Sequence, residues 1–377
     1  MQHEQEYFMN ARQWFEITNI DTIDTPALVF YKDRIEENIR RLKKRVPDAD
    51  RLRPHVKTNK SADVCVMMMK EGIYKFKCAT IAEAEMLATV KAKDVLLAYQ
   101  PVGPKIHRLL ELAKQYPQTH FSCVVDNAVS AKEIAAIFRS HACTLNVYID
   151  INVGMNRTGV TPENAFALYE EIFPLPGISI IGLHVYDGHI TDADISIRRQ
   201  RCSSGYDKVR VLSELITKKY HRKVSVVAGG SPTFPLHAEH QEIECSPGTF
   251  VLWDWSYKKT YPDEPFDYAA LVVTRVVSII DSTAMTIDLG HKSVAAENPL
   301  PRVHFLNASE VIPAAHSEEH MMVTVPDTKK YSIGDVLYGV PVHICPTVAL
   351  YERAMVVELN IVNAEWKITA RDKRITL

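Results

Sequence analysis

The sequence predicts an α/β protein, with an N-terminal (β/α)8 TIM-like barrel over residues 26–246 and a C-terminal β-rich domain over residues 247–377. In the first part, short apolar runs alternate with amphipathic segments, which is typical of a parallel sheet covered by helices. After residue 246, β-branched runs are separated by turn residues and few helical patterns remain. We expect residues 1–25, whose pattern is mixed, to pack on the second domain.

The predicted barrel contains about eight βα units, which fits a closed barrel better than an open doubly wound sheet. Its strands are short apolar runs at 27–31, 51–56, 75–80, 94–100, 120–126, 144–151, 178–186 and 223–229, with a weaker run at 242–245. Its helices have apolar residues at helical spacing, at 33–46, 61–72, 81–92, 104–116, 127–141, 161–173 and 192–219.

Capping residues support the ends of several predicted helices. Asp33 is well placed to start the first helix, Gly72 to stop the second, and Pro104 lies near the start of the fourth. Thr161 is expected at the N-cap of the sixth, with Pro162 at its first helical position. In the second domain, the predicted strands are the runs at 270–281, 284–290, 320–325 and 353–362.

The composition is that of an ordinary globular enzyme, with 46% hydrophobic and 24% charged residues in a chain of 377. The net charge of −2 gives no electrostatic reason to expect nucleic acid or an anionic membrane as a partner. No apolar run approaches the ~20 residues that span a bilayer. The first 17 residues are too polar for a secretory signal, so a cytoplasmic location is expected.

Two common nucleotide-binding motifs, GxGxxG after a strand and GxxxxGK[ST], do not occur. Five of the seven cysteines lie in apolar or helical contexts without the spacing of metal ligands. We interpret these five as reduced, mostly buried thiols: Cys65, Cys78, Cys123, Cys143 and Cys202.

The stretch at 51–60, RLRPHVKTNK, places Lys57 just past the end of a predicted strand, where an α/β barrel keeps its chemistry. A partly desolvated lysine at such a position can form a Schiff base with a carbonyl compound or with pyridoxal phosphate. The alternative is a solvated lysine with no role, because most lysines that follow a strand are of that kind.

Other predicted strand ends also carry reactive or anion-binding groups. Arg157 lies between Gly154 and Gly159, where it would meet an anionic oxygen or, alternatively, form a surface salt bridge. The diglycine turn AGGSPTF brings backbone amides and hydroxyls to a phosphate-binding position after a late strand, although such a sequence is often only a tight turn. The groups at these strand ends are His55, Asn59, Thr80, Glu83, His184, Tyr186, Asp187, His189, Gly229, Gly230, Ser231 and Thr233.

The second domain carries its own cluster of metal-binding residue types. Glu318, Glu319 and His320 follow one another, and His343 and Cys345 are two residues apart. If 343–345 is a strand, the imidazole and the thiol face the same side and can bind one divalent metal ion. Two protein ligands leave positions open for water and substrate, which suits a catalytic metal. The alternative is a buried cysteine beside a hydrogen-bonded histidine.

The segment RPHVKTNK resembles the RPHxKxHK signature of the D-threonine aldolase and D-serine dehydratase family, which are pyridoxal phosphate enzymes of the alanine-racemase-like type. The similarity runs through most of the chain in the same order, in DTPALV, CVVDNA, VGMNRTGV, YDGH, GGSPTF, SEEH and HICPTV. It implies an N-terminal barrel, a C-terminal β-domain and a homodimer with its sites near the subunit interface.

The resemblance also implies roles for single residues. Lys57 would carry the cofactor as a Schiff base, Arg157 would approach its phenolic oxygen, and Tyr186 would lie near its ring nitrogen. Gly229, Gly230, Ser231 and Thr233 would hold the phosphate, and His343 and Cys345 would bind a divalent metal beside the substrate. His55 is a further candidate catalytic residue at the same strand end.

Two features depart from a simple match. Asn59 stands where relatives usually have histidine, so the role of that histidine is in doubt. The His-x-Cys pair resembles D-serine dehydratases, and a thiolate favours zinc over manganese or magnesium. CVVDNA and the stretch at 247–254 look closer to the aldolases.

The leading prediction is therefore retro-aldol cleavage of a D-β-hydroxy-α-amino acid, a small-molecule substrate, to glycine and an aldehyde. Dehydration of D-serine to pyruvate and ammonia is the first alternative. Amino-acid racemisation, which needs no metal, and a non-catalytic pyridoxal phosphate carrier are the others.

Overall fold

The computed structural model describes residues 13–377, which form two compact units. The barrel unit comprises Glu37–Val251, Tyr257–Phe266 and Lys367–Leu377. The strand-rich unit contains the described residues up to Glu36, together with Leu252–Ser256 and Asp267–Trp366. Both units are thus assembled from separate stretches of chain, whereas the sequence suggested a barrel over 26–246 and a second domain over 247–377 on which residues 1–25 pack.

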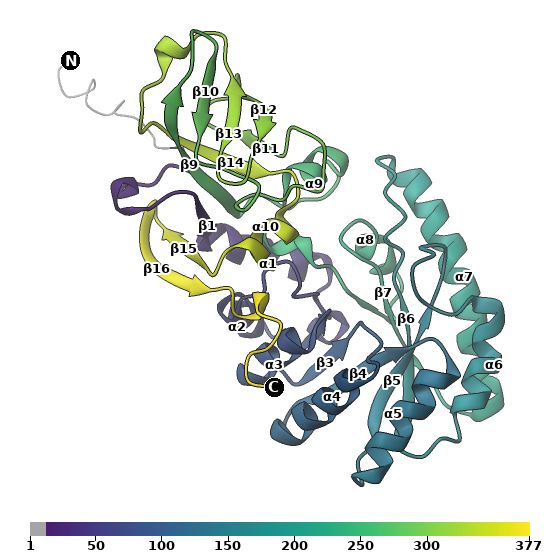
Figure 1. Cartoon of the computed structure of the whole chain (residues 1–377). Helices are drawn as coiled ribbons and strands as arrows, with labels where there is room; N and C mark the ends of the chain where they lie inside the picture. The colour runs from purple at the N-terminus through teal and green to yellow at the C-terminus, as the bar shows by residue number, and fades with distance from the viewer. Residues whose placement is uncertain (1–12) are drawn as a thin grey trace, which may run out of the picture. The chain divides into compact units, whose positions relative to one another are not determined.

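A seven-stranded parallel sheet forms the centre of the barrel unit, in the order β2-β3-β4-β5-β6-β7-β8 (Figure 1). Its residues are mostly buried, because helices cover one face and the barrel interior fills the other. The predicted (β/α) barrel class is confirmed. The strands are β2 (Lys75–Cys78), β3 (Asp94–Leu97), β4 (His120–Val125), β5 (Leu145–Ile151), β6 (Ile178–Val185), β7 (Ser225–Ala228) and β8 (Ile243–Cys245).

The predicted strand at 51–56 forms an irregular extended segment that lies between β8 and β2 and so closes the sheet into a barrel. Arg53 N and His55 N donate to the carbonyls of Cys245 and Pro247, at 2.9 and 2.8 Å, on the β8 side. On the β2 side, Val56 N donates to Lys77 O and Lys77 N to Pro54 O, both at 2.9 Å. Pro54 has no N–H to donate, so the segment lacks a continuous ladder and makes only isolated bridges.

Helices follow the strands of the barrel unit and pack on the outside of the sheet (Figure 1). Each buries one apolar side, as α4 does with Ile106, Leu109 and Leu112. Thr161 is the N-cap of α6 and Pro162 its first residue, as predicted. The helices are α1 (Lys32–Arg45), α2 (Ala62–Lys70), α3 (Ile81–Thr89), α4 (Pro104–Gln115), α5 (Ala128–Ser140), α6 (Pro162–Ile172), α7 (Ile195–Tyr220) and α8 (Phe234–His237).

The run at 27–31 is a strand, β1 (Ala27–Tyr31), but it does not belong to the barrel sheet. It pairs antiparallel with β9 and parallel with β15 in the strand-rich unit. All five of its residues are buried, so its hydrophobicity is equally compatible with either sheet. Phe15, Ile17 and Ile23 contribute to the same core, and the rest of the predicted 1–25 segment lies partly outside the described residues.

The strand-rich unit is a nine-stranded sheet whose main path runs β12-β13-β10-β9-β1-β15-β16, with β14 joining β9 to β11. Its second core cluster includes Val272, Met285 and Phe305. The elements not yet named are β9 (Ala270–Ile279), β10 (Ala284–Ile287), β11 (Val303–Phe305), β12 (Ile312–His316), β13 (Met321–Thr324), β14 (Val336–Pro341), β15 (Arg353–Glu358), β16 (Ile361–Lys367), α9 (Trp255–Thr260) and α10 (Ile344–Leu350).

None of the helices within residues 13–377 is long and apolar enough to cross a membrane. The seven cysteines are free thiols, and Cys65, Cys78, Cys123, Cys202 and Cys245 are buried.

Candidate active site

A cavity of about 610 Å³ lies at the carboxyl ends of the barrel strands. The predicted residues His55, Lys57 and Arg157 all line it. Lys57 has no ion-pair partner among the described residues, whereas Lys60, three positions on, is paired with the buried carboxylate of Glu83. The further lining residues are Ala79, Ala98, Tyr99, Gln100, Val102, Val124, Asp126, Asp150 and Thr158.

Three cationic side chains surround the ring of Tyr186. The Nζ atoms of Lys57 and Lys77 lie 5.7 and 5.6 Å from the ring centroid, and Arg157 Cζ lies 5.2 Å from it. Cations attract the electron-rich face of an aromatic ring, but one ring does not neutralise three of them. The arrangement therefore leaves positive charge available for an anionic group in the cavity.

His55 is held next to Lys57 by a local contact, because its Nδ1 accepts the Lys57 backbone N–H at 3.2 Å. Burial, followed by the charge of Lys57, lowers the pKa of His55 well below its usual value, so the imidazole is neutral. Asn59, which replaces the family histidine, is buried and accepts from Ser61 N at 3.0 Å. Its Nδ2 has no hydrogen-bond partner within the described residues.

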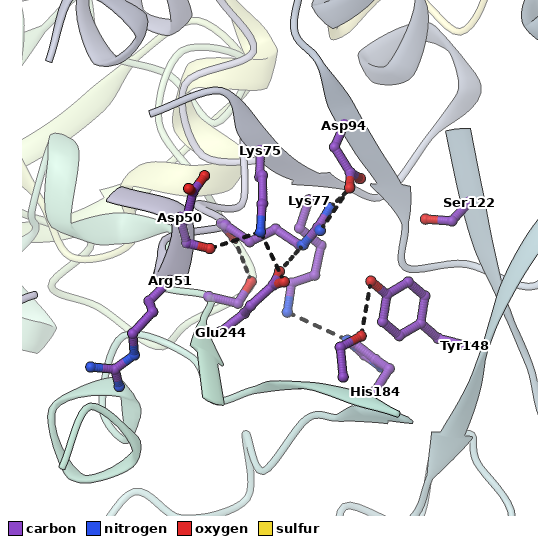
Figure 2. Close-up of polar contacts among 12 residues, drawn as sticks. Asp50, Arg51, Lys75, Lys77, Asp94, Ser122, Tyr148, His184 and Glu244 are labelled. Atoms are coloured by element: carbon purple, nitrogen blue, oxygen red, sulfur yellow. Dashed lines mark hydrogen bonds and ion pairs between the residues drawn. The ribbon is translucent and has the colours of Figure 1, made fainter. Parts of the chain in front are cut away.

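A hydrogen-bonded series of polar side chains lies inside the barrel and begins at Lys77 on β2. Lys77 Nζ is 3.4 Å from His184 Nε2, a contact visible in Figure 2. His184 Nδ1 donates to Asp150 Oδ1 at 2.7 Å, and Thr158 Oγ1 donates to Asp150 Oδ2 at 2.9 Å. Burial raises the pKa of Asp150, but these two hydrogen bonds outweigh it, so the pKa is lowered and Asp150 is a carboxylate.

A second network lies at the other end of the barrel interior. The buried Arg53 donates to Glu244 at 2.7 Å and to Asp94 at 2.6 and 3.1 Å. Lys75 reaches the same Glu244 at 3.1 Å (Figure 2). Each cation here has a carboxylate partner, so this network supports the barrel and is not available for chemistry.

The turn after β7 contains the predicted phosphate-binding residues. Gly229 has φ +82°, a conformation that favours glycine, and a Cβ on Gly230 would lie 3.1 Å from Tyr186 Cε2. Ser231 Oγ accepts from Gly248 N and Thr249 N, at 3.2 and 2.9 Å, which leaves its hydroxyl hydrogen free to donate. The amides of Gly229, Gly230 and Thr233 already donate within the protein, so the turn offers a phosphate the hydroxyl of Ser231.

Asp187 stabilises this turn through hydrogen bonds. Its Oδ1 accepts from Thr233 Oγ1 at 2.6 Å, and its Oδ2 accepts from His237 Nε2 at 2.8 Å. Cys202 Sγ lies 3.3 Å from the same His237 nitrogen and 3.8 Å from Asp187 Oδ2. Histidine, cysteine and aspartate are metal-ligand types, but every contact in this buried group is also a hydrogen-bond distance. We therefore describe it as a hydrogen-bonded support for Thr233.

The predicted metal pair, His343 and Cys345, belongs to the strand-rich unit. The expectation that 343–345 is a strand is wrong: β14 ends at Pro341, and His343 is the N-cap of α10. The two side chains are nevertheless hydrogen-bonded to each other, and His343 Nδ1 lies 2.6 Å from Glu297 Oε1. Burial lowers the pKa of His343, but Cys345 and Glu297 outweigh it and raise the pKa to about 9. His343 thus contacts both a thiol and a carboxylate, and histidine and cysteine are ligand types that suit zinc.

Of the twelve residues that line the cavity, sequence reasoning named His55, Lys57 and Arg157. It missed Asp150, and also Lys77 near the Tyr186 ring. The pattern KFKC could have indicated Lys77, because alternate residues of a strand face the same side. Phe76 and Cys78 are buried, so Lys75 and Lys77 must share the barrel interior.

The fold and the site define the class of protein: it has an alanine-racemase-like barrel and a strand-rich second unit. Residues 31–252 match the family described as alanine racemase, N-terminal domain, and residues 269–357 match the putative serine dehydratase domain. The chain belongs to the alanine racemase N-terminal domain family, and the predicted resemblance is confirmed.

The chain is similar over most of its length to proteins with named activities. It is 26% identical over 363 residues to D-threonine aldolase of Arthrobacter sp., covering 93% of each chain. It is 25% identical over 366 residues to 3-hydroxy-D-aspartate aldolase of Paracoccus denitrificans, again covering 93% of each. The crystal structure of D-threonine aldolase from Filomicrobium marinum shares the fold, with a TM-score of 0.85, 24% identity, and coverage of 96% of this chain and 99% of that one.

Proposed function

We propose that this protein is a pyridoxal-phosphate- and metal-dependent lyase that cleaves a D-β-hydroxy-α-amino acid to glycine and an aldehyde. The observation that carries the proposal is the position of Lys57, which lines the cavity without an ion-pair partner and shares the face of Tyr186 with Arg157. Relatives named D-threonine aldolase and 3-hydroxy-D-aspartate aldolase, which align over 93% of this chain, support the reaction class.

The residues present fit pyridoxal phosphate. The glycine turn leaves room beside Tyr186 that a Cβ on Gly230 would fill, and the Ser231 hydroxyl, which accepts from two amides, can donate to a phosphate. Lys57 would bind the cofactor covalently, and Arg157 would face its phenolic oxygen. When bound, the cofactor supplies a ring that accepts the electron pair of the broken bond.

The protein groups have separate tasks in such a cleavage. The β-hydroxyl loses its proton, the Cα–Cβ bond breaks, the hydroxyl carbon becomes the aldehyde carbonyl, and the α-carbon takes up a proton to give glycine. Lys57 would give up its bond to the cofactor when the substrate amine enters and would re-form that bond when glycine leaves. His55, neutral and next to Lys57, accepts at Nδ1 and so carries its hydrogen on Nε2, which can donate a hydrogen bond in the cavity.

His343 and Cys345 would hold the metal, which supplies a Lewis acid for the β-hydroxyl. The thiol favours zinc over manganese or magnesium. The same thiol is the observation that favours the second candidate function, dehydration of D-serine, together with the match of residues 269–357 to the putative serine dehydratase domain. We further propose a homodimer, as the family resemblance implies.

Parallel product assays test the proposal. Protein loaded with pyridoxal phosphate and zinc is expected to form glycine and acetaldehyde from D-threonine, and the Lys57→Ala variant is expected to form neither. Pyruvate from D-serine without glycine from D-threonine would establish the dehydratase instead. Racemisation of alanine that survives a chelator would establish a racemase.

A further inference from the structure

Lys77 is a buried lysine that the proposed function does not use. Its side chain is 2% exposed and points into the barrel from the middle of β2. Its Nζ has one hydrogen-bond partner within residues 13–377, His184 Nε2 at 3.4 Å, and it makes no ion pair there. Lys75, two residues earlier on the same face, is bonded to the carboxylate of Glu244 at 3.1 Å. A buried lysine without a carboxylate partner is costly and calls for a role.

His184 can retain Lys77 in either of its charge states. The Nδ1–H of His184 donates to the Asp150 carboxylate, so Nε2 carries a lone pair that faces Lys77. Both an ammonium and a neutral amine have an N–H to donate to that lone pair. Burial, with the charge of Lys77, lowers the pKa of His184, so the imidazole stays neutral while Lys77 changes charge.

The charges that face Lys77 nearly balance. Burial lowers its pKa, followed by the charge of Lys57, while Asp187 and Asp150 raise it and Arg53 lowers it. The result is a pKa of about 7. Among the other groups nearby, His55 and His184 are neutral, and the Arg157 guanidinium faces the same Tyr186 ring as Lys77. Loss of the positive charge at Lys57 therefore raises the pKa of Lys77 and favours its protonation.

We propose that Lys77 is the proton partner of Lys57: it takes up, inside the barrel, the proton that Lys57 gives up when its nitrogen bonds to an aldehyde carbon. This rests on the proposed function, in which Lys57 makes that bond. As the ammonium of Lys57 reacts, a carbon–nitrogen double bond forms, the carbon–oxygen bond breaks, water leaves, and one proton remains. Release of the amine reverses the exchange, so Lys57 and Lys77 together keep one positive charge throughout.

Calorimetry of pyridoxal phosphate binding to the apo-protein tests this exchange. Titration at pH 8.5 in two buffers with different heats of ionisation gives the number of protons released per chain. The wild type is expected to release about one proton fewer than Lys77→Met, because Lys77 accepts it. The difference is expected to shrink at pH 6, where Lys77 is already charged before binding. Lys75→Met is the matched control and is expected to behave as the wild type.

Lys77→Gln provides a second variant that keeps an N–H donor for His184 and cannot be charged. Its proton release is expected to equal that of Lys77→Met if the charge of Lys77 matters. It would equal that of the wild type if only the hydrogen bond to His184 matters. Equal proton release by the wild type and both variants would overturn the inference, provided that absorbance shows the cofactor bonded to all three proteins. If the wild type itself forms no such bond, the proposed function is wrong and with it the inference.

Discussion

Buried ionisable side chains in the barrel unit fall into two kinds. Arg53 is buried among carboxylates, and although burial lowers its pKa, Glu244 and Asp94 outweigh this and raise it. Glu264 is equally buried, at 3% exposed, but neither carboxyl oxygen has a hydrogen-bond partner within the described residues. Burial accordingly raises the pKa of Glu264 to about 7. The first kind is matched in charge, whereas the second is destabilised whenever it ionises.

Replacing Glu264 with glutamine is therefore expected to stabilise the protein in a pH-dependent manner. Since the folded-state pKa is raised from 4.5 to about 7, the folded state binds more protons than the unfolded state between these values. The wild type loses stability as pH rises through that window and carries the full cost above it. The gain for Glu264→Gln should approach about 3 kcal/mol at pH 8 and vanish near pH 4.

Urea unfolding of both proteins at pH 4, 6 and 8 measures this gain. Glu133→Gln, an exposed position on α5, serves as the control and is expected to show no such trend. A stability difference for Glu264→Gln that stays constant across the three pH values would show that ionisation of Glu264 is not its cause.

At the scale of single elements, the loop after β6 depends on a glycine that packs on Tyr186. A Cβ on Gly188 would lie 2.4 Å from Tyr186 Cζ and 2.5 Å from its Oη. Gly188→Ala must displace the ring that Lys57 and Arg157 face, at the cost of overpacking, about 1–3 kcal/mol. The affinity for pyridoxal phosphate is expected to fall by about 5- to 100-fold, as measured by absorbance titration.

Gly205→Ala is the matched control for this substitution. Gly205 lies inside α7, and a Cβ there would meet Val153 Cβ at 3.5 Å, an ordinary contact. This variant should bind pyridoxal phosphate as the wild type does and gain about 1 kcal/mol of stability from helix propensity. An unchanged affinity in Gly188→Ala would mean that the position of the Tyr186 ring does not determine cofactor binding.

The barrel elements could be predicted because apolar runs and helical spacing alternate regularly, as at β5 and α6. The elements that differed did so for local reasons. Pro54 removes a donor and leaves the 51–56 segment irregular, and His343 caps a helix where a strand was expected. The apolar neighbours of His343, Val342 and Ile344, do not distinguish the end of a strand from the start of a short helix.

At the scale of the whole molecule, the partner of β1 could not be predicted. β1 pairs with β15, from the far end of the chain, and its five buried residues carry no signal for one sheet over the other. His55, Lys57 and Arg157 of the candidate site were predictable, because they follow strand ends that converge in a barrel. Lys77 was not, because it lies within a strand and its neighbours come from distant segments.

Metal content is a second property of the whole molecule. Zinc per chain, measured by mass spectrometry after dialysis, is expected to fall in Cys345→Ser and to remain unchanged in Cys202→Ser. Aldol cleavage should be lost after chelation and restored by zinc, while binding of pyridoxal phosphate is unaffected. Loss of zinc from Cys202→Ser instead would assign the metal to the buried group of Asp187, Cys202 and His237.

The most direct test of the central claim is to locate the lysine that binds the cofactor. Borohydride reduction of the protein with pyridoxal phosphate, followed by peptide mapping, fixes the cofactor on the lysine that carries it. We predict that the label lies on Lys57, that it is absent from Lys57→Ala, and that Lys77 remains unlabelled. A label on Lys77, or no label on the wild type, would contradict the account.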